Sequence, residues 1–154
     1  MHLGIDLGTT RTIVAYVDRG NYPVVTFLDM EDEVQDHFPS VVALRDGLLV
    51  HGFEAMQAAD EGYPMLRSFK RALAAADVNA SSTIRVGDQD VNLLALVTSF
   101  CVALREALEK RSSISSMIGA GESVDAVVDV PAAFVDATNI DDEDVQQVLK
   151  PART

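Results

Sequence analysis

A short glycine-threonine turn between two β-type segments at the start of the chain constrains the fold most. Apolar residues alternate with other residues over positions 3–7, Gly8-Thr9-Thr10 interrupts the pattern, and positions 12–17 are again rich in β-branched and aromatic side chains. The sequence therefore predicts a β-hairpin with a polar, glycine-bearing tip.

Further β-type segments follow this hairpin. Residues 22–28 come after Arg19-Gly20-Asn21, whose glycine and asparagine suit a second tight reversal. The first 28 residues are therefore predicted to form a β-meander of three antiparallel strands. Asp46-Gly47 separates the apolar residues 41–44 from residues 48–50 and predicts a smaller hairpin.

Helical patterns occupy the middle of the chain. Residues 53–59 are a short helix candidate, and Pro64 is expected in the first turn of a second helix that continues to Leu73. The clearest helix follows a predicted strand at residues 83–86, and its apolar residues recur three and four positions apart. These residues are Leu93, Val97, Phe100, Leu104 and Leu108. Cys101 lies on the same stripe and is interpreted as a small packed hydrophobe.

A valine-dense segment over residues 124–130 follows the serine- and glycine-rich connector of residues 112–123 and ends at Pro131. Dense valines are typical of an interior strand covered on both faces. The helix that precedes this segment makes its parallel addition to the sheet plausible. With 154 residues and 48% apolar content, the chain is expected to form one α/β unit.

The charge balance excludes several classes of partner. Twelve basic residues against 24 acidic ones give a net charge of −12, so no nucleic acid or anionic membrane is expected as a partner. The acidic runs at residues 29–36 and 141–144 are interpreted as solvated loops or helix starts. No apolar run reaches the roughly 20 residues that a bilayer requires, and no signal-peptide pattern is present. A cytoplasmic location is therefore expected, and the single cysteine fits a reducing compartment.

The glycine-threonine turn has the parts of a phosphate-binding loop. Gly8 permits a close backbone approach, Thr9 and Thr10 offer hydroxyl and amide donors, and Asp6 can hold magnesium through water. Such turns also close ordinary hairpins, so the pattern alone leaves both interpretations open. Asp6 favours the phosphate loop, because an ionised side chain among apolar neighbours is costly without a cation or hydrogen-bond partners.

Four segments in order resemble the DnaK-type heat-shock chaperone family. Residues 4–10, with the sequence Gly-Ile-Asp-Leu-Gly-Thr-Thr, resemble its first phosphate segment, and Pro39-Ser40-Val41-Val42-Ala43 resembles its threonine-proline-serine strand entry. Phe69-Lys70-Arg71-Ala72-Leu73 resembles its lysine-arginine helix, and residues 124–137 resemble its valine-proline-alanine stretch. A sugar kinase shares the actin-type fold but is not expected to show the last two segments at these separations.

The resemblance implies a fold and a domain division. It implies an α/β, ribonuclease-H-like lobe of an actin-type ATPase, with a mixed sheet, flanking helices and a small α+β insert. Residues 1–137 would form this lobe, with residues 1–33 and 91–137 as the sheet subdomain and residues 34–90 as the insert. Residues 138–154 would form a divergent acidic tail.

The resemblance also implies roles for single residues. Thr9 and Thr10 would contact the β- and γ-phosphates of ATP or ADP above Gly8, Asp6 would order water bound to Mg²⁺, and Lys70 would position the attacking water electrostatically. Without the resemblance, Lys70 is better interpreted as a solvated lysine on a helix face beside other basic residues.

Two departures from the family concern single positions. Asn139 stands where the family places an arginine eight residues after the proline of its nucleotide switch, here Pro131. Arg11 stands where relatives commonly carry a smaller polar residue or tyrosine, and it adds positive charge beside the proposed phosphate site.

The third departure is one of extent. The family's second phosphate loop, adenosine pocket and peptide-binding domain are not among these 154 residues. A non-catalytic, partner-binding half-domain is therefore an alternative. Clients and co-chaperones are implied only for a full-length relative, and self-association through an uncovered lobe face is a further expectation.

Overall fold

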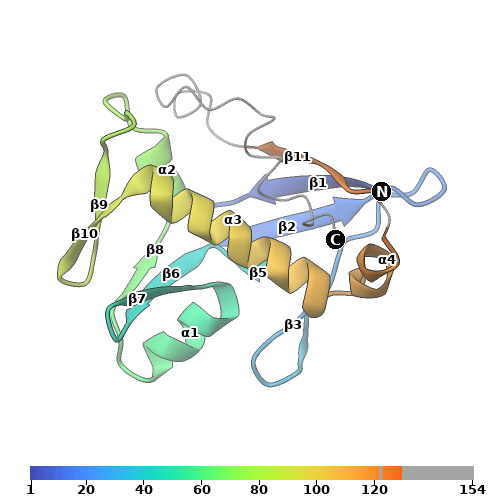
Figure 1. Cartoon of the computed structure of the whole chain (residues 1–154), viewed down its shortest axis with the longest axis horizontal. Helices are drawn as coiled ribbons and strands as arrows, with labels where there is room; N and C mark the ends of the chain where they lie inside the picture. The colour runs from blue at the N-terminus through green and yellow to red at the C-terminus, as the bar shows by residue number, and fades with distance from the viewer. Residues whose placement is uncertain (122, 130–154) are drawn as a thin grey trace.

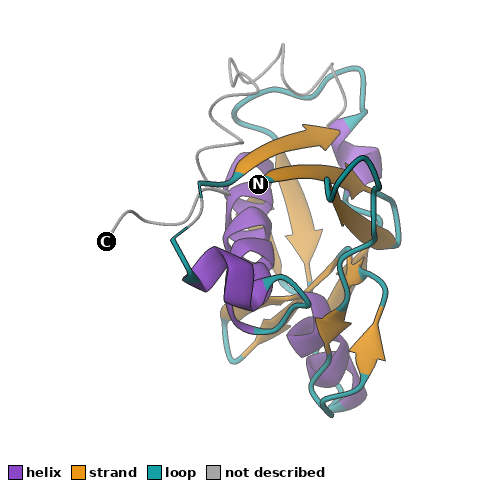
Figure 2. Ribbon diagram, turned by 90° about the vertical axis from the view of Figure 1, so that its right-hand side faces the viewer, coloured by secondary structure: helices purple, strands orange, loops and turns teal. Residues whose placement is uncertain are grey.

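The computed structural model describes residues 1–121 and 123–129, which form a mixed α/β fold with several small sheets (Figures 1 and 2). The main sheet has the strand order β11-β1-β2-β5. Its strands are β1 (His2–Leu7), β2 (Arg11–Tyr16), β5 (Phe38–Pro39) and β11 (Asp125–Asp129).

Three smaller sheets complete the β-structure. They are formed by β3 (Phe27–Leu28) with β4 (Val34–Gln35), by β6 (Val41–Arg45) with β7 (Leu48–His51) and β8 (Met65–Arg67), and by β9 (Thr83–Val86) with β10 (Gln89–Asn92). The helices are α1 (Gly52–Asp60), α2 (Lys70–Leu73), α3 (Leu93–Lys110) and α4 (Ser115–Gly119).

The predicted hairpins are confirmed. β1 and β2 pair antiparallel, with Gly4 opposite Ala15, and β6 and β7 pair antiparallel around a turn at Asp46 and Gly47. Both turn residues have positive φ, 51° and 79°, which is the backbone that a two-residue hairpin loop of this hand requires. The local sequence was sufficient here because the turn residues and the alternating strands agree.

The prediction that residues 22–28 form the third strand of a meander is wrong. Residues 22–25 follow β2 only loosely: the Val25 amide donates to the Val14 carbonyl at 2.7 Å, and the Tyr16 amide donates to the Pro23 carbonyl at 3.1 Å. Pro23 has no N–H to return, so no regular ladder forms. The strand that pairs with β2 in the main sheet is instead the short β5.

The helix predicted from Pro64 to Leu73 is also wrong. Residues Met65–Arg67 form β8, which pairs antiparallel with β6. Ser68 then has a φ of 59°, a conformation that interrupts any helix, so only the single turn of α2 follows. The apolar residues that suggested a helix are used as an edge strand because β6 needs a partner on that side.

The predicted long helix is confirmed as α3, which packs against one face of the main sheet (Figure 1). The Asn92 side chain accepts from the Ala95 amide at 3.0 Å and so caps the first turn. The buried residues of α3 include all five of the predicted stripe: Leu93, Val97, Phe100, Leu104 and Leu108. They share one core with Leu3, Ile5 and Leu7, the inward-facing residues of β1.

The valine-dense segment forms a parallel strand as expected, but the strand is not covered on both faces. β11 pairs parallel with β1, with Asp129 opposite Asp6. Ala126 is buried, but Val127 is 69% exposed on the opposite face. Among the described residues, β11 has β1 as its only strand neighbour, so it is an edge strand with one open face rather than a covered interior strand.

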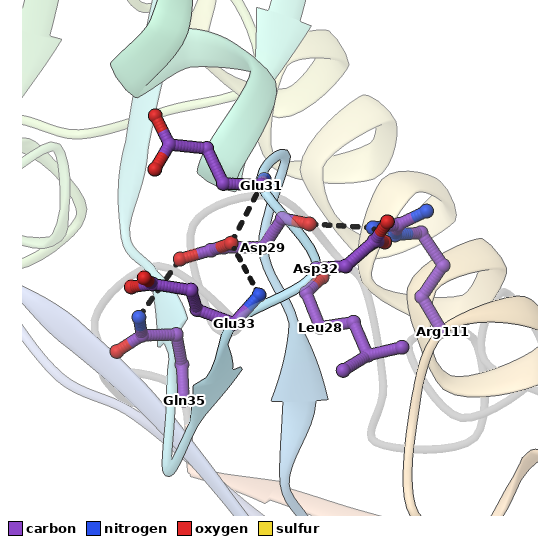
Figure 3. A network of polar contacts seen from close by, with 7 residues as sticks. All are labelled: Leu28, Asp29, Glu31, Asp32, Glu33, Gln35 and Arg111. Carbon is purple, nitrogen blue, oxygen red and sulfur yellow. Dashed lines mark hydrogen bonds and ion pairs between the residues drawn. The ribbon is translucent and has the colours of Figure 1, made fainter.

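Arg111 ties the acidic loop to the end of α3 (Figure 3). Its guanidinium donates to the carbonyls of Leu28 and Asp29 and, at 2.8 Å, to the Asp32 carboxylate. Asp29 accepts from the side chain of Gln35 and from the amides of Glu31 and Glu33, and these bonds lower the pKa of Asp29. The carboxylate of Asp29 therefore organises its own loop.

His51, at the start of α1, is expected to make the fold sensitive to acid. Its Nε2 lies 2.8 Å from the hydroxyl of Ser99, which itself donates to the Leu96 carbonyl, so the neutral ring donates from Nε2. Burial lowers the pKa of His51 to about 4, while nearby Glu106 opposes the shift. In the unfolded chain His51 has its ordinary pKa of 6.5 and binds a proton at a higher pH than in the folded chain. The free energy of unfolding therefore falls as the pH drops from 6.5 to about 4.

The expected loss is about 2 kcal/mol between about pH 7 and about pH 5, measured by urea unfolding. His51→Gln keeps a donor toward Ser99 but cannot titrate, so its stability should lose less over the same interval. An equal loss in both proteins would show that other groups carry the pH dependence.

Candidate functional site

The tip of the β1–β2 hairpin is a tight loop that only glycine can close. The Gly8 amide donates to the carbonyls of Asp6 at 3.1 Å and Arg11 at 3.0 Å. A Cβ on Gly8 would lie 2.3 Å from the Arg11 carbonyl oxygen, so no other residue fits without moving the backbone. Thr9 and Thr10 are exposed residues at the tip.

A buried polar pair fixes the base of this loop to the junction between β5 and β6. The Thr12 and Ser40 hydroxyls lie 2.8 Å apart and are almost completely buried. The Ser40 amide also donates to the Thr10 carbonyl at 3.1 Å. Because each buried hydroxyl has a partner, the contact stabilises the loop at little desolvation cost. The sequence interpretation missed this pair, although Thr12 stands at a core-facing position of β2.

Asp6 lies on the solvent side of β1. Its side chain alternates with the buried Ile5 and Leu7 and is exposed. The expectation that an ionised Asp6 is surrounded by apolar neighbours is therefore wrong, because the strand's alternation turns it away from the core. Asp6 is therefore a solvent-exposed carboxylate, two residues before Gly8, that can contact a hydrated cation.

Lys70 is brought to the same end of the sheet by aromatic packing. The preceding residue, Phe69, is buried with its ring centroid 5.1 Å from that of Phe100 on α3, which fixes α2 beside the first half of α3 (Figure 1). The Lys70 ammonium lies 3.8 Å from the Asp129 carboxylate at the end of β11. Asp129 is the register partner of Asp6 on β1.

These contacts place the candidate residues along one edge. β1 and β11 are parallel, so their carboxyl ends lie together, and the Gly8 loop leaves the sheet at that edge. Ligands of open α/β sheets bind outside the carboxyl ends of the strands. Gly8, Thr9, Thr10, Asp6 and Lys70 are thus residues of one region, contributed by a hairpin tip, a strand end and a helix turn.

Arg11 contributes charge beside the loop. It is exposed at the start of β2. The His37 side chain, by hydrogen bonding, is the main cause that lowers the pKa of Asp36, and Arg11 adds a smaller effect of the same sign. The positive charge of Arg11 therefore acts electrostatically on the carboxylate of Asp36 as well as on the Gly8 loop.

Cys101 is confirmed as a packed core residue. Its thiol is free and buried on α3. Burial raises the pKa of Cys101 to about 11, so at neutral pH the side chain is an unreactive thiol.

Other sequence-based expectations concern residues that the described structure does not cover, or groups that it does not bring together. Pro131, Asn139 and the acidic run at residues 141–144 lie outside the described residues. Within residues 1–121 and 123–129, no three histidine, cysteine or acidic side chains converge as metal ligands would. Over the same residues, no helix has the length and apolar character needed to cross a membrane.

Comparison with known proteins supports the resemblance seen in the motifs. The chain is 29% identical over 136 residues to the chaperone protein DnaK of Mycoplasmopsis agalactiae. It is 28% identical over 146 residues to a chaperone protein HscA homolog of Pasteurella multocida. The chain is distantly similar to DnaK and HscA chaperones.

The similarity covers most of this chain but only a small part of each relative. Each match covers 88% of this chain but only 20% of the DnaK and 23% of the HscA homolog. The chain therefore spans about a fifth of the length of the curated chaperones it matches. No family model matches it.

Proposed function

We propose that this chain is the phosphate-binding first lobe of a DnaK-type, actin-like ATPase domain. The lobe would have ribonuclease-H-like topology, with residues 1–33 and 91–137 as its sheet subdomain, residues 34–90 as an insert and residues 138–154 as a divergent tail. The observation that carries the proposal is the Gly8 loop, closed where a Cβ cannot fit and positioned at the carboxyl edge that also holds Lys70.

The residues at this edge fit a nucleotide phosphate with magnesium. Thr9 and Thr10 would donate hydroxyl and amide hydrogen bonds to the β- and γ-phosphates, which the Gly8 turn allows to approach the backbone closely. Asp6, exposed on the same edge, would accept hydrogen bonds from water on Mg²⁺. The ion neutralises phosphate charge when it is bound.

Lys70 would act by its charge. Its side chain is 25% exposed, and its direction is limited by the anchored α2 turn. A cation held in this way stabilises negative charge that develops on a transferring phosphoryl group. The role proposed for Lys70 is to bind the γ-phosphate and orient the attacking water.

The expected affinity of these 154 residues for ATP is weak, in the millimolar range, and turnover should barely exceed background. The residues proposed at this edge act on phosphate and magnesium, and phosphate contacts alone yield modest affinity. Binding of clients and co-chaperones is proposed only for full-length relatives.

Calorimetric titration with MgATP tests this proposal. Lys70→Ala should weaken binding about threefold to tenfold, because one positive charge beside the phosphates is lost. Lys110→Ala removes the same charge at the far end of α3 and should leave the affinity unchanged. Equal affinities of the wild type and Lys70→Ala would contradict the role of Lys70.

A partner-binding half-domain is the second candidate, and one observation favours it. The open face of the main sheet carries an apolar row, Val127–Gly4–Ala15–Val24, across neighbouring segments. Val127 and Val24 are 69% and 46% exposed. A chain that binds no ATP but self-associates in sedimentation experiments would favour this second function over the first.

A further inference from the structure

We propose that Asp129 is the resting partner of Lys70 and is exchanged for the nucleotide phosphate on binding. This inference rests on the proposed function, because it concerns the same phosphate edge. The inference assigns a new role to Asp129: this residue controls access to Lys70 and thereby lowers the affinity of the site for anions. Asp129 is a positioning residue, since it acts on the nucleotide through Lys70.

The contact that carries the inference is the ion pair between two elements. The Lys70 ammonium lies 3.8 Å from Asp129 Oδ2, and the side chain of Asp129 is 73% exposed. Lys70 comes from the anchored turn of α2, whereas Asp129 is the last residue of β11. The pair thus spans the two elements that border the carboxyl edge of the sheet.

The register of the sheet places a second carboxylate beside the first. Asp129 and Asp6 are paired on the adjacent parallel strands β11 and β1, so their Cα atoms are about 4.8 Å apart. Both side chains are on the exposed face of the sheet. The carboxylate of Asp6 therefore lies on the strand next to the Lys70–Asp129 pair, on the same face of the sheet, before any ligand arrives.

An arriving phosphate must compete with Asp129 for Lys70. A pair exposed to this degree is screened by water and is weak, so a multiply charged phosphate with Mg²⁺ can displace it. The carboxylate of Asp129 then lies near the bound anion without a partner and repels it. Removing that carboxylate should consequently favour phosphate binding rather than weaken it.

The test compares two isosteric changes on the same strand. Asp129→Asn removes the carboxylate that contacts Lys70, and Asp125→Asn removes one on the same face at the opposite end of β11, where it faces His2 at 3.9 Å. Both variants lose one negative charge from an exposed position. The dissociation constant of MgATP should fall about threefold to tenfold in Asp129→Asn and stay unchanged in Asp125→Asn.

A double variant separates exchange of Lys70 from simple repulsion. In a Lys70→Ala background, Asp129→Asn should lose most of its advantage, because no ammonium remains to be released. In the absence of nucleotide, the ammonium group of Lys70 should be more ordered by nuclear magnetic resonance in the wild type than in Asp129→Asn.

Each outcome decides between the claims. If the wild type binds ATP and Asp129→Asn binds it equally or more weakly, the inference is overturned while the proposed function stands. If the gain in Asp129→Asn is the same with and without Lys70, the exchange is overturned. If no variant binds ATP at millimolar concentration, the proposed function fails, and this inference fails with it.

Discussion

Replacing Phe100 by alanine is expected to lower the free energy of unfolding by about 3–5 kcal/mol, because a fully buried aromatic side chain is deleted. Phe100 is 0% exposed, and its ring makes edge contacts with Phe38 at 5.6 Å, Phe69 at 5.1 Å and His51 at 6.4 Å. These partners come from β5, the residue before α2 and the end of β7. One ring therefore joins α3 to three separate segments.

Urea unfolding measures this loss, and Tyr22→Ala supplies the control. Tyr22 is also aromatic but is 73% exposed, so its truncation should change stability by less than about 0.5 kcal/mol. Because Phe69 directly precedes Lys70, Phe100→Ala should also loosen the position of Lys70. A loss below about 1 kcal/mol for Phe100→Ala would contradict its central place in the core.

Replacing Gly52 by alanine is expected to destabilise the fold by about 2–4 kcal/mol. Gly52 has a φ of 59°, and a Cβ built there would lie 2.1 Å from the Cζ atom of Phe38. The left-handed backbone and the overlap with a buried ring both oppose a side chain. Phe38 cannot yield easily, because it is packed against Phe27, Phe53 and Phe100.

Gly62→Ala separates the two causes. Gly62 also has a positive φ, 94°, but nothing lies within 4 Å of an added Cβ. Its replacement should therefore cost only the backbone strain, about 1–2 kcal/mol. Thermal or urea unfolding measures both variants. Equal losses of stability in Gly52→Ala and Gly62→Ala would show that the overlap with Phe38 adds nothing to the backbone strain.

The features predicted correctly from the sequence are those that local pattern determines. The Gly8 hairpin, the Asp46-Gly47 hairpin and α3 each combine a periodic apolar pattern with suitable turn or capping residues. The parallel direction of β11 was also expected, because a helix precedes the strand, whereas its partner β1 was not predicted.

The errors arose where a distant partner decides the structure. Residues 65–67 form β8 because β6 offers a strand edge, and no local signal at Pro64 shows that edge. Residues 22–28 do not form a full strand, because Pro23 cannot complete a ladder with β2.

Parts of the candidate site were likewise beyond local pattern. The contact between Thr12 and Ser40 joins residues 28 positions apart, and that between Lys70 and Asp129 joins two elements that only the folded sheet brings together. Asp6 was placed among apolar neighbours because its sequence neighbours are apolar. Alternation along β1 instead directs it to solvent.

The central claim is that the Gly8 loop binds nucleotide phosphate, and amide nuclear magnetic resonance during a MgATP titration tests it most directly. We expect the amides of Gly8, Thr9 and Thr10 to shift progressively up to millimolar ATP. The matched region, the Asp46-Gly47 hairpin turn, should not shift. Titration with adenosine, which lacks phosphate, should leave the Gly8 loop unchanged. Shifts confined to other residues, or none at Gly8, Thr9 and Thr10, would contradict the assignment of this loop as the phosphate site.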